Sequence, residues 1–139
     1  MEQLLEEDLC QLIEKCKEDQ AAEKDNRRQL ILRWLPKQLI RYPKAELKRI
    51  LIHLNIYMQV KRIEPIAEPM SKVYSNVELS TIVYSAISQY DNTSRKDCAV
   101  LVKELFKIQY QGTSVESINK KMNVIRRIPG LTNNAVEFS

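Results

Sequence analysis

The fold is decided by residues 43–54, which read PKAELKRILIHL. Their apolar positions follow the three- and four-residue spacing of one helix face, namely Leu47, Ile50, Leu51 and Leu54. Proline is favoured as the first residue of a helix, because the N–H that it lacks has no helical partner there. We therefore predict an amphipathic helix that begins at Pro43 and buries its apolar face.

Toward the C-terminus, three stretches have the spacing of a capping box, in which a hydroxyl and an acidic side chain three residues later cover free N–H groups. They are SNVE (75–78), SRKD (94–97) and TSVE (113–116). An apolar stripe at helical spacing follows each of them. We predict three more helices, the second ending at Gly112 and the third continuing to the stop at Pro129-Gly130.

Two helical segments are predicted before Pro43. Residues 3–22 carry one apolar face and a charged opposite face, so this helix is expected to pack only lightly; the apolar face is Leu5, Leu9, Leu12, Ile13 and Cys16. Asp25-Asn26 predicts a break and a new N-cap. A second segment follows from Arg27 to Tyr42, and Pro36 within it predicts a kink or two short helices.

The remaining region, residues 61–75, contains Pro65 and Pro69 and is expected to hold one short helix. The β-branched stretch TIVY (81–84) leaves a strand open as the alternative, although its flanks keep helical spacing. The chain has only two glycines, which is too few for the hairpin turns of a sheet protein. We predict an all-α fold, a single helical bundle of about six helices with no sheet.

The 139 residues fit one domain. We divide it into a charged amphipathic N-terminal helix (1–24), a helical bundle core (25–130) and a polar tail (131–139). The chain is also compatible with being a fragment of a longer protein.

The charge is segregated along the chain. Residues 1–23 carry eight acids and two bases, whereas residues 24–62 carry eleven bases and two acids. Such segregation either pairs within the molecule or faces a charged partner. The basic positions are candidate contacts to a partner protein or a nucleic acid, together with an aromatic neighbour: Arg33, Trp34, Lys37, Arg41, Lys44, Lys48 and Arg49.

These candidate contacts have two interpretations. Arg33, Lys37 and Arg41 share a helix face, and cations on such a face bind nucleic-acid phosphates in a salt-sensitive way. The alternative is a solvated helix face that the acidic first helix partly neutralises. Trp34 in the same segment either stacks on bases or packs in a core, and core packing is the usual role of a tryptophan beside leucine.

The chain has few of the residues that bind metals or catalyse reactions. His53 is the sole histidine, and the three cysteines form no C-x-x-C pair, so we expect no metal site. Two distant glycines cannot form a phosphate-binding loop, and the paired carboxylates lie on a solvated face. We expect no catalytic residues, no cofactor and no enzymatic activity.

The expected cellular location follows from sequence features that the chain lacks. No run of 18 apolar residues could span a membrane, and the acidic N-terminus is no signal peptide. An odd number of cysteines is typical of a reducing compartment. We expect an intracellular protein, nuclear rather than cytoplasmic, without a membrane partner.

The C-terminal half resembles part of a known bundle. CAVLVKEL (98–105), the turn at 111–113 and MNVIRRI (122–128) are similar to two helices of the integrase-binding domain of lens-epithelium-derived growth factor, which groups with the N-terminal domains of transcription elongation factors such as S-II and elongin A. Residues 46–90 can be placed on the same pattern instead. The resemblance implies a nuclear module that captures short linear motifs of transcription or chromatin proteins, and it carries over no binding residues.

The function that we predict is non-enzymatic protein–protein docking, in which a groove between helices receives an apolar helix or peptide. The alternative is a nucleic-acid-binding module that uses the basic surface of residues 27–62. A third expectation is a homo-oligomer formed through the N-terminal helix.

Overall fold

The computed structural model describes residues 2–122 and 125–131, with side chains from residue 7 onward. Within these residues it contains five helices and no strand, so the all-α prediction is confirmed while the number of helices is one lower than expected. The helices are α1 (Glu2–Gln38), α2 (Lys44–Val60), α3 (Asn76–Asp91), α4 (Arg95–Leu105) and α5 (Val115–Lys121).

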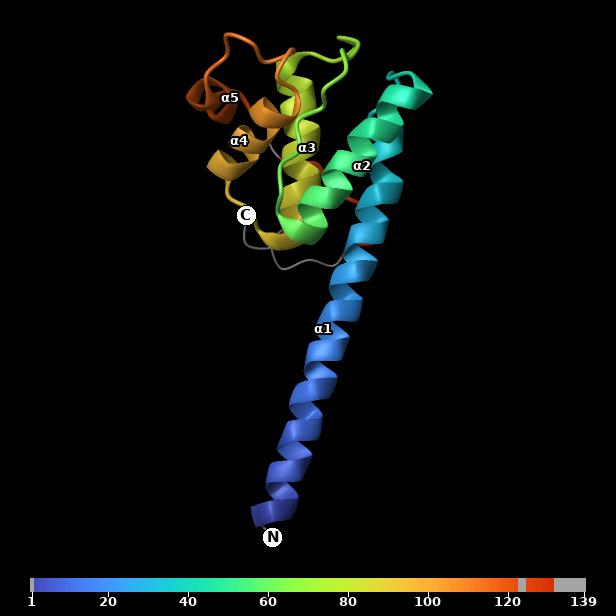
Figure 1. Cartoon of the computed structure of the whole chain (residues 1–139), viewed down its shortest axis with the longest axis vertical. Helices are drawn as coiled ribbons and strands as arrows, with labels where there is room; N and C mark the ends of the chain where they lie inside the picture. The colour runs from blue at the N-terminus through green and yellow to red at the C-terminus, as the bar shows by residue number, and fades with distance from the viewer. Residues whose placement is uncertain (1, 123–124, 132–139) are drawn as a thin grey trace.

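The helices form a head from which one long helix projects (Figure 1). In the head, α3 contacts α1, α4 and α5, and α2 packs against α1. The N-terminal half of α1 leaves the head and runs alone, away from every other helix (Figure 1). The 37 residues of α1 correspond to a rod of about 55 Å.

Helix α3 is the centre of the head because it is buried on nearly all sides. Its buried residues run from Leu79 to Val83 and from Ser85 to Tyr90. A helix that is apolar or small on every side belongs inside a core rather than at its surface. The stretch TIVY (81–84), for which a strand was the alternative, lies within α3.

Serine hydroxyls cap the first turns of α3, α4 and α5, which confirms the three helix starts that the sequence predicts. Ser75, Ser94 and Ser114 each accept a hydrogen bond of 3.1 Å from the N–H three residues later. The third cap is Ser114 rather than Thr113, one residue later than its box predicted. Pro43 occupies the N-cap position of α2, so that helix begins one residue later than predicted.

The predicted break at Asp25-Asn26 is wrong, because α1 continues through it and through Pro36. Asp25 pairs with Arg28 one turn later, which lets its side chain stabilise the helix instead of capping a new one. Pro36 has no N–H to donate to the carbonyl four residues earlier, so α1 lacks one hydrogen bond there and still continues to Gln38. The division of the chain at residues 24 and 25 therefore falls inside one helix.

No helix forms in residues 61–75, contrary to the prediction. The segment is held instead by bonds from other elements: His53 Nδ1 lies 2.6 Å from the Glu64 carbonyl, and Ile66 donates its N–H to the Leu105 carbonyl at 3.2 Å. The Glu46 carboxylate accepts hydrogen bonds from the backbone N–H and the hydroxyl of Ser71. These partners replace the helical bonds of the segment.

The last two helices are shorter than predicted. Helix α4 ends at Leu105, before Gly112, because the following turns bury Tyr110, whose hydroxyl donates to the Asn76 carbonyl at 2.6 Å. Helix α5 ends at Lys121, and residues 125–128 run non-helically beside α3. The predicted polar tail lies outside the described residues except for Leu131, which packs partly buried against the core.

Candidate interaction surfaces

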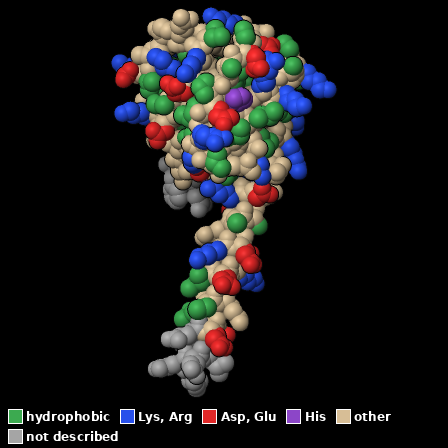
Figure 2. Space-filling model, viewed as in Figure 1, with side chains coloured by type: hydrophobic (Ala, Val, Ile, Leu, Met, Phe, Trp, Pro, Cys, Tyr) green, Lys and Arg blue, Asp and Glu red, His purple; other side chains and the backbone are tan. Residues whose placement is uncertain are grey.

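The projecting half of α1, residues 7–26, is exposed along its whole described length, and we call it the stalk. Leu9, Leu12 and Ile13 are 49%, 57% and 53% exposed on one face of it. Figure 2 shows hydrophobic side chains gathered on one side of this helix. The light packing expected of the first helix is thus present, and its apolar stripe meets nothing in the head.

The stalk is attached to the head by two arginines at its base. Arg27 donates to the Tyr90 carbonyl at 3.2 Å, and Arg28 donates to the Asn55 side chain at 2.7 Å. Lys24 lies over the Tyr90 ring, 5.2 Å from its centroid. Because the head fixes the end of α1, the costly nucleation of the helix is already complete and the stalk only extends it.

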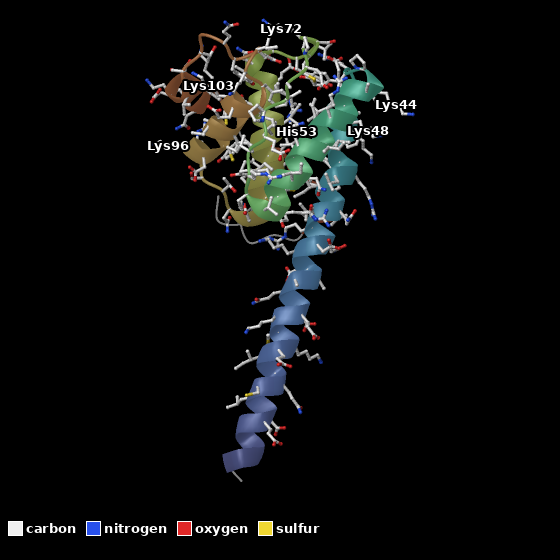
Figure 3. All side chains as sticks on the ribbon, viewed as in Figure 1. Lys44, Lys48, His53, Lys72, Lys96 and Lys103 are labelled. Atoms are coloured by element: carbon white, nitrogen blue, oxygen red, sulfur yellow. The ribbon has the colours of Figure 1, made fainter. Side chains whose placement is uncertain are left out.

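The basic candidate residues separate into two groups. Arg41 lies 4.0 Å from the Glu78 carboxylate and over the Tyr74 ring, and Arg49 lies 3.3 Å from Glu68. Within the described part of the chain, the other four cations have no ion pair: Arg33, Lys37, Lys44 and Lys48. We call these four the free basic patch. Figure 3 shows Lys44 and Lys48 following one another on α2, consistent with their spacing of one helical turn.

Trp34 does not join these cations at the surface. It is only 7% exposed and belongs to the core, with Ile31 and Leu35 on the same helix. Its indole is therefore unavailable for stacking on a base, and core packing is the role that the structure gives it.

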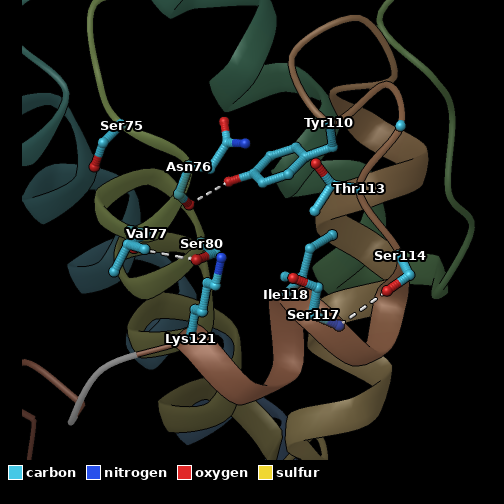
Figure 4. A pocket seen from close by; sticks show the side chains of 11 residues that line it. Ser75, Asn76, Val77, Ser80, Tyr110, Thr113, Ser114, Ser117, Ile118 and Lys121 are labelled. Atoms are coloured by element: carbon cyan, nitrogen blue, oxygen red, sulfur yellow. Dashed lines mark hydrogen bonds between the residues drawn. The ribbon is translucent and has the colours of Figure 1, made fainter.

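A cavity of about 430 Å³ opens between the start of α3, the turns after α4, and α5 (Figure 4). Val77, Tyr110 and Ile118 give it an apolar floor, while serine and threonine hydroxyls line its rim. Among its described lining residues Lys121 is the single charged one, and Figure 4 shows it reaching along the wall toward Ser80. This volume and lining suit a side chain of a partner or a small polar molecule.

No sequence signal pointed to this cavity. Its walls come from residues 75–80, 110–114 and 117–121, which the fold brings together from separate helices. The capping serines Ser75 and Ser114 were recognised as helix starts, but their shared location depends on how α3 and α5 pack.

The remaining reactive residues are isolated from one another. Cys10 and Cys16 are exposed on the stalk, whereas Cys98 is buried, and burial raises the pKa of its thiol to about 12. The ring of His53 is half-buried, and its Nδ1 faces a carbonyl, so that nitrogen carries the proton. Among the described residues, no group of three His, Cys, Asp or Glu side chains could hold a metal ion. The helices of the described residues include none with an apolar stretch that could span a membrane.

The chain matches no family model, no curated protein and no solved structure. No role of an interaction surface is therefore taken from a relative.

Proposed function

We propose that this protein is a non-enzymatic docking module whose stalk binds a helix of a protein partner. The observation that carries this proposal is the exposed apolar stripe of Leu9, Leu12 and Ile13 on a helix that the head holds in place. Helical recognition of this kind uses apolar anchors at three- and four-residue spacing on one helix face. Leu9, Leu12 and Ile13 have this spacing.

Energetics favour a partner for this helix. Most helix stability in proteins comes from packing an amphipathic face, and the apolar stripe of the stalk is exposed. Covering a leucine side chain completely contributes about 1.5–3 kcal/mol. A partner helix would therefore gain affinity from the stripe and would stabilise the stalk in return.

The setting that we propose is a transcription or chromatin assembly in the nucleus. The support for this setting is the sequence resemblance of residues 98–105, which lie in α4, to a helix of those docking bundles; the second stretch of the resemblance, residues 122–128, is not helical in its described part. In such a setting the cavity beside Lys121 offers a second contact, for a polar or acidic side chain of a bound segment.

The test compares proteins recovered with three versions of the chain. The first is the wild type, the second carries Leu9→Gln with Leu12→Gln, and the third carries Glu7→Gln with Glu14→Gln as a control away from the stripe. Glutamine has nearly the helix propensity of leucine, so the stalk keeps its conformation. We expect stripe-dependent partners, further copies of the chain included, to be recovered with the wild type and the control and lost with the leucine variant.

Identical recovery with all three versions would contradict a stripe-dependent docking function. Circular dichroism of each version serves as the check on folding, since these side chains contact nothing in the head.

A second candidate function, nucleic-acid binding, is favoured by one observation. The free basic patch presents four exposed cations without ion pairs among the described residues. Cations that are not neutralised internally are available to contact phosphates. Since Trp34 is buried, base stacking by this residue is not part of this candidate.

A further inference from the structure

We propose that the stalk's occupant is a second copy of this chain, with the two stalks paired antiparallel. This inference rests on the proposed docking role of the stalk and names its partner. Three features of the stalk carry it, which are the order of its apolar positions, the charges beside them and the position of the head.

Four of the five apolar positions on this face of α1 read the same in both directions, and the fifth, Ile13, lies beside them. Leu9, Leu12 and Cys16 follow the heptad spacing of a coiled-coil seam, and the sequence extends this spacing back to Leu5. The intervals are four, three and four residues, which is a palindrome. A second copy running in the opposite direction therefore places Leu9 against Leu12 of its partner, and Leu12 against the partner's Leu9.

The charges beside this seam favour the antiparallel direction. Asp8 and Lys15 are one heptad apart, so they lie on the same edge of the stripe. In an antiparallel pair the same edges of the two helices face each other, and Asp8 of each copy lies near Lys15 of the other. The two-fold symmetry gives two such attractive contacts.

A parallel pair lacks these contacts and adds repulsion. Residues 1–8 hold four acids and no base, so a parallel pair would set two identical acidic segments side by side. Like charges on adjacent helix surfaces disfavour association. The antiparallel pair instead places residues 1–8 along residues 13–20 of the partner, where Lys15 and Lys17 offset two of the three acids.

The position of the heads allows this pairing. Every side chain of residues 7–26 is exposed, so a second helix can approach the stripe without displacing part of the head. With Leu9 opposite Leu12, the two copies of Arg27 are separated by roughly 33 residue positions, or about 50 Å along the helices. The dimer therefore carries one head at each end, with both cavities and both free basic patches available.

The first experiment measures the mass of the intact chain in solution over a range of concentrations, by sedimentation equilibrium. We expect a monomer–dimer equilibrium for the wild type and for the control Glu7→Gln with Glu14→Gln. The variant Leu9→Gln with Leu12→Gln is expected to stay monomeric. A wild type that is monomeric at the highest concentration would overturn the proposal.

The second experiment determines the direction by disulfide formation, in a background with Cys10→Ser and Cys16→Ser. Leu12→Cys alone places its thiols opposite each other only in a parallel pair. Leu9→Cys together with Leu12→Cys places thiols opposite each other in an antiparallel pair as well. We expect a covalent dimer from the double substitution and none from Leu12→Cys alone, and a covalent dimer from Leu12→Cys alone would overturn the antiparallel arrangement.

A contact between the acidic stalk of one copy and the free basic patch of another would also give a dimer. Such a dimer would dissociate on substitution of Lys44 and Lys48 by glutamine, whereas the antiparallel stalk pair is unaffected, so loss of the dimer in that variant counts against the proposal. The result that would refute self-pairing differs from the result that would refute the docking function. A monomeric wild type that still recovers other proteins through its stripe would refute self-pairing and leave docking intact.

Discussion

The side-chain amide of Gln89 donates a 2.7 Å hydrogen bond to the carbonyl oxygen of Arg126, on the segment that follows α5. The same side chain accepts from the Ile128 N–H at 3.3 Å, and the Ser85 hydroxyl one turn earlier accepts from the Arg126 N–H at 2.9 Å. Ser85 and Gln89 of the central helix, which we call the polar ladder, therefore bond three backbone groups of residues 126–128. This ladder explains how a segment without helical bonds of its own packs against α3.

Replacing Gln89 by leucine is expected to destabilise the head. The substitution removes both bonds to residues 126–128 and leaves a buried N–H without a partner, which costs about 1–3 kcal/mol. Urea unfolding followed by circular dichroism gives the change in the free energy of unfolding. The control is Gln59→Leu, on the exposed face of α2, and equal effects of the two substitutions would contradict the role of the ladder.

The same chemical change at two neighbouring tyrosines is expected to have opposite effects. The Tyr74 hydroxyl donates to the Gln38 carbonyl at 2.8 Å and accepts from the Arg41 N–H at 3.1 Å, so it closes the C-terminal end of α1. The Tyr42 hydroxyl is the one buried side-chain polar atom without a partner among the described residues. Tyr74→Phe should lower the free energy of unfolding by about 1–3 kcal/mol, whereas Tyr42→Phe should leave it unchanged or raise it.

Thermal and urea unfolding of both variants beside the wild type measure this difference. The rings of the two tyrosines lie 5.3 Å apart in one cluster, so each variant controls for packing effects in the other. A Tyr42→Phe variant less stable than Tyr74→Phe would show that the Tyr42 hydroxyl has a partner.

Much of the fold was predictable because its signals are local. The caps at Ser75 and Ser94 and the stripe of Leu47 to Leu54 depend on residues within a turn or two of each other, and the structure confirms the helices that they predict. The predictions failed where distant partners decide the conformation. The bonds of His53 to residue 64 and of Gln89 to residue 126 are not encoded in any local pattern.

The interaction surfaces also divide into features that local sequence predicts and features that depend on distant residues. The light packing of the first helix followed from its charged face, which is a property of the helix alone. The separation of the basic residues into paired and free groups depends on where Glu68 and Glu78 lie in the folded chain. The burial of Trp34 and the cavity beside Lys121 likewise depend on packing between helices.

Alkaline pH is expected to unfold the head. Burial raises the pKa of Tyr42 to about 12 and that of Cys98 to about 12, and it raises the pKa of Tyr110 in the same direction. In the unfolded chain these groups have their ordinary pKa values, 10.0 for tyrosine and 9.0 for cysteine, so above those values the unfolded state releases protons that the folded state retains. Stability is fully present below pH 9 and falls by about 1.4 kcal/mol per pH unit for each group as the pH rises toward 12.

Tyrosinate absorbance and circular dichroism over the same pH series test this expectation. The ionisation of Tyr42 and Tyr110 should coincide with the loss of helix. Ionisation of Tyr42 and Tyr110 near pH 10 with the helical spectrum unchanged would contradict it.

The free basic patch makes the nucleic-acid alternative testable against a charge-matched control. The variant replaces Arg33, Lys37, Lys44 and Lys48 by glutamine, and the control replaces four other exposed cations in the same way, namely Lys72, Lys96, Lys120 and Arg127. Four phosphate contacts give a slope of about −3.6 for the logarithm of affinity against the logarithm of salt concentration, which is a loss of roughly 10²-fold between about 50 and about 200 mM salt. If the patch binds a random duplex, its variant should lose this slope and the control should keep it. Equal slopes for variant and control, or no binding at about 50 mM salt, would refute phosphate recognition by these four cations and leave the protein-docking role of the stalk as the function that the geometry supports.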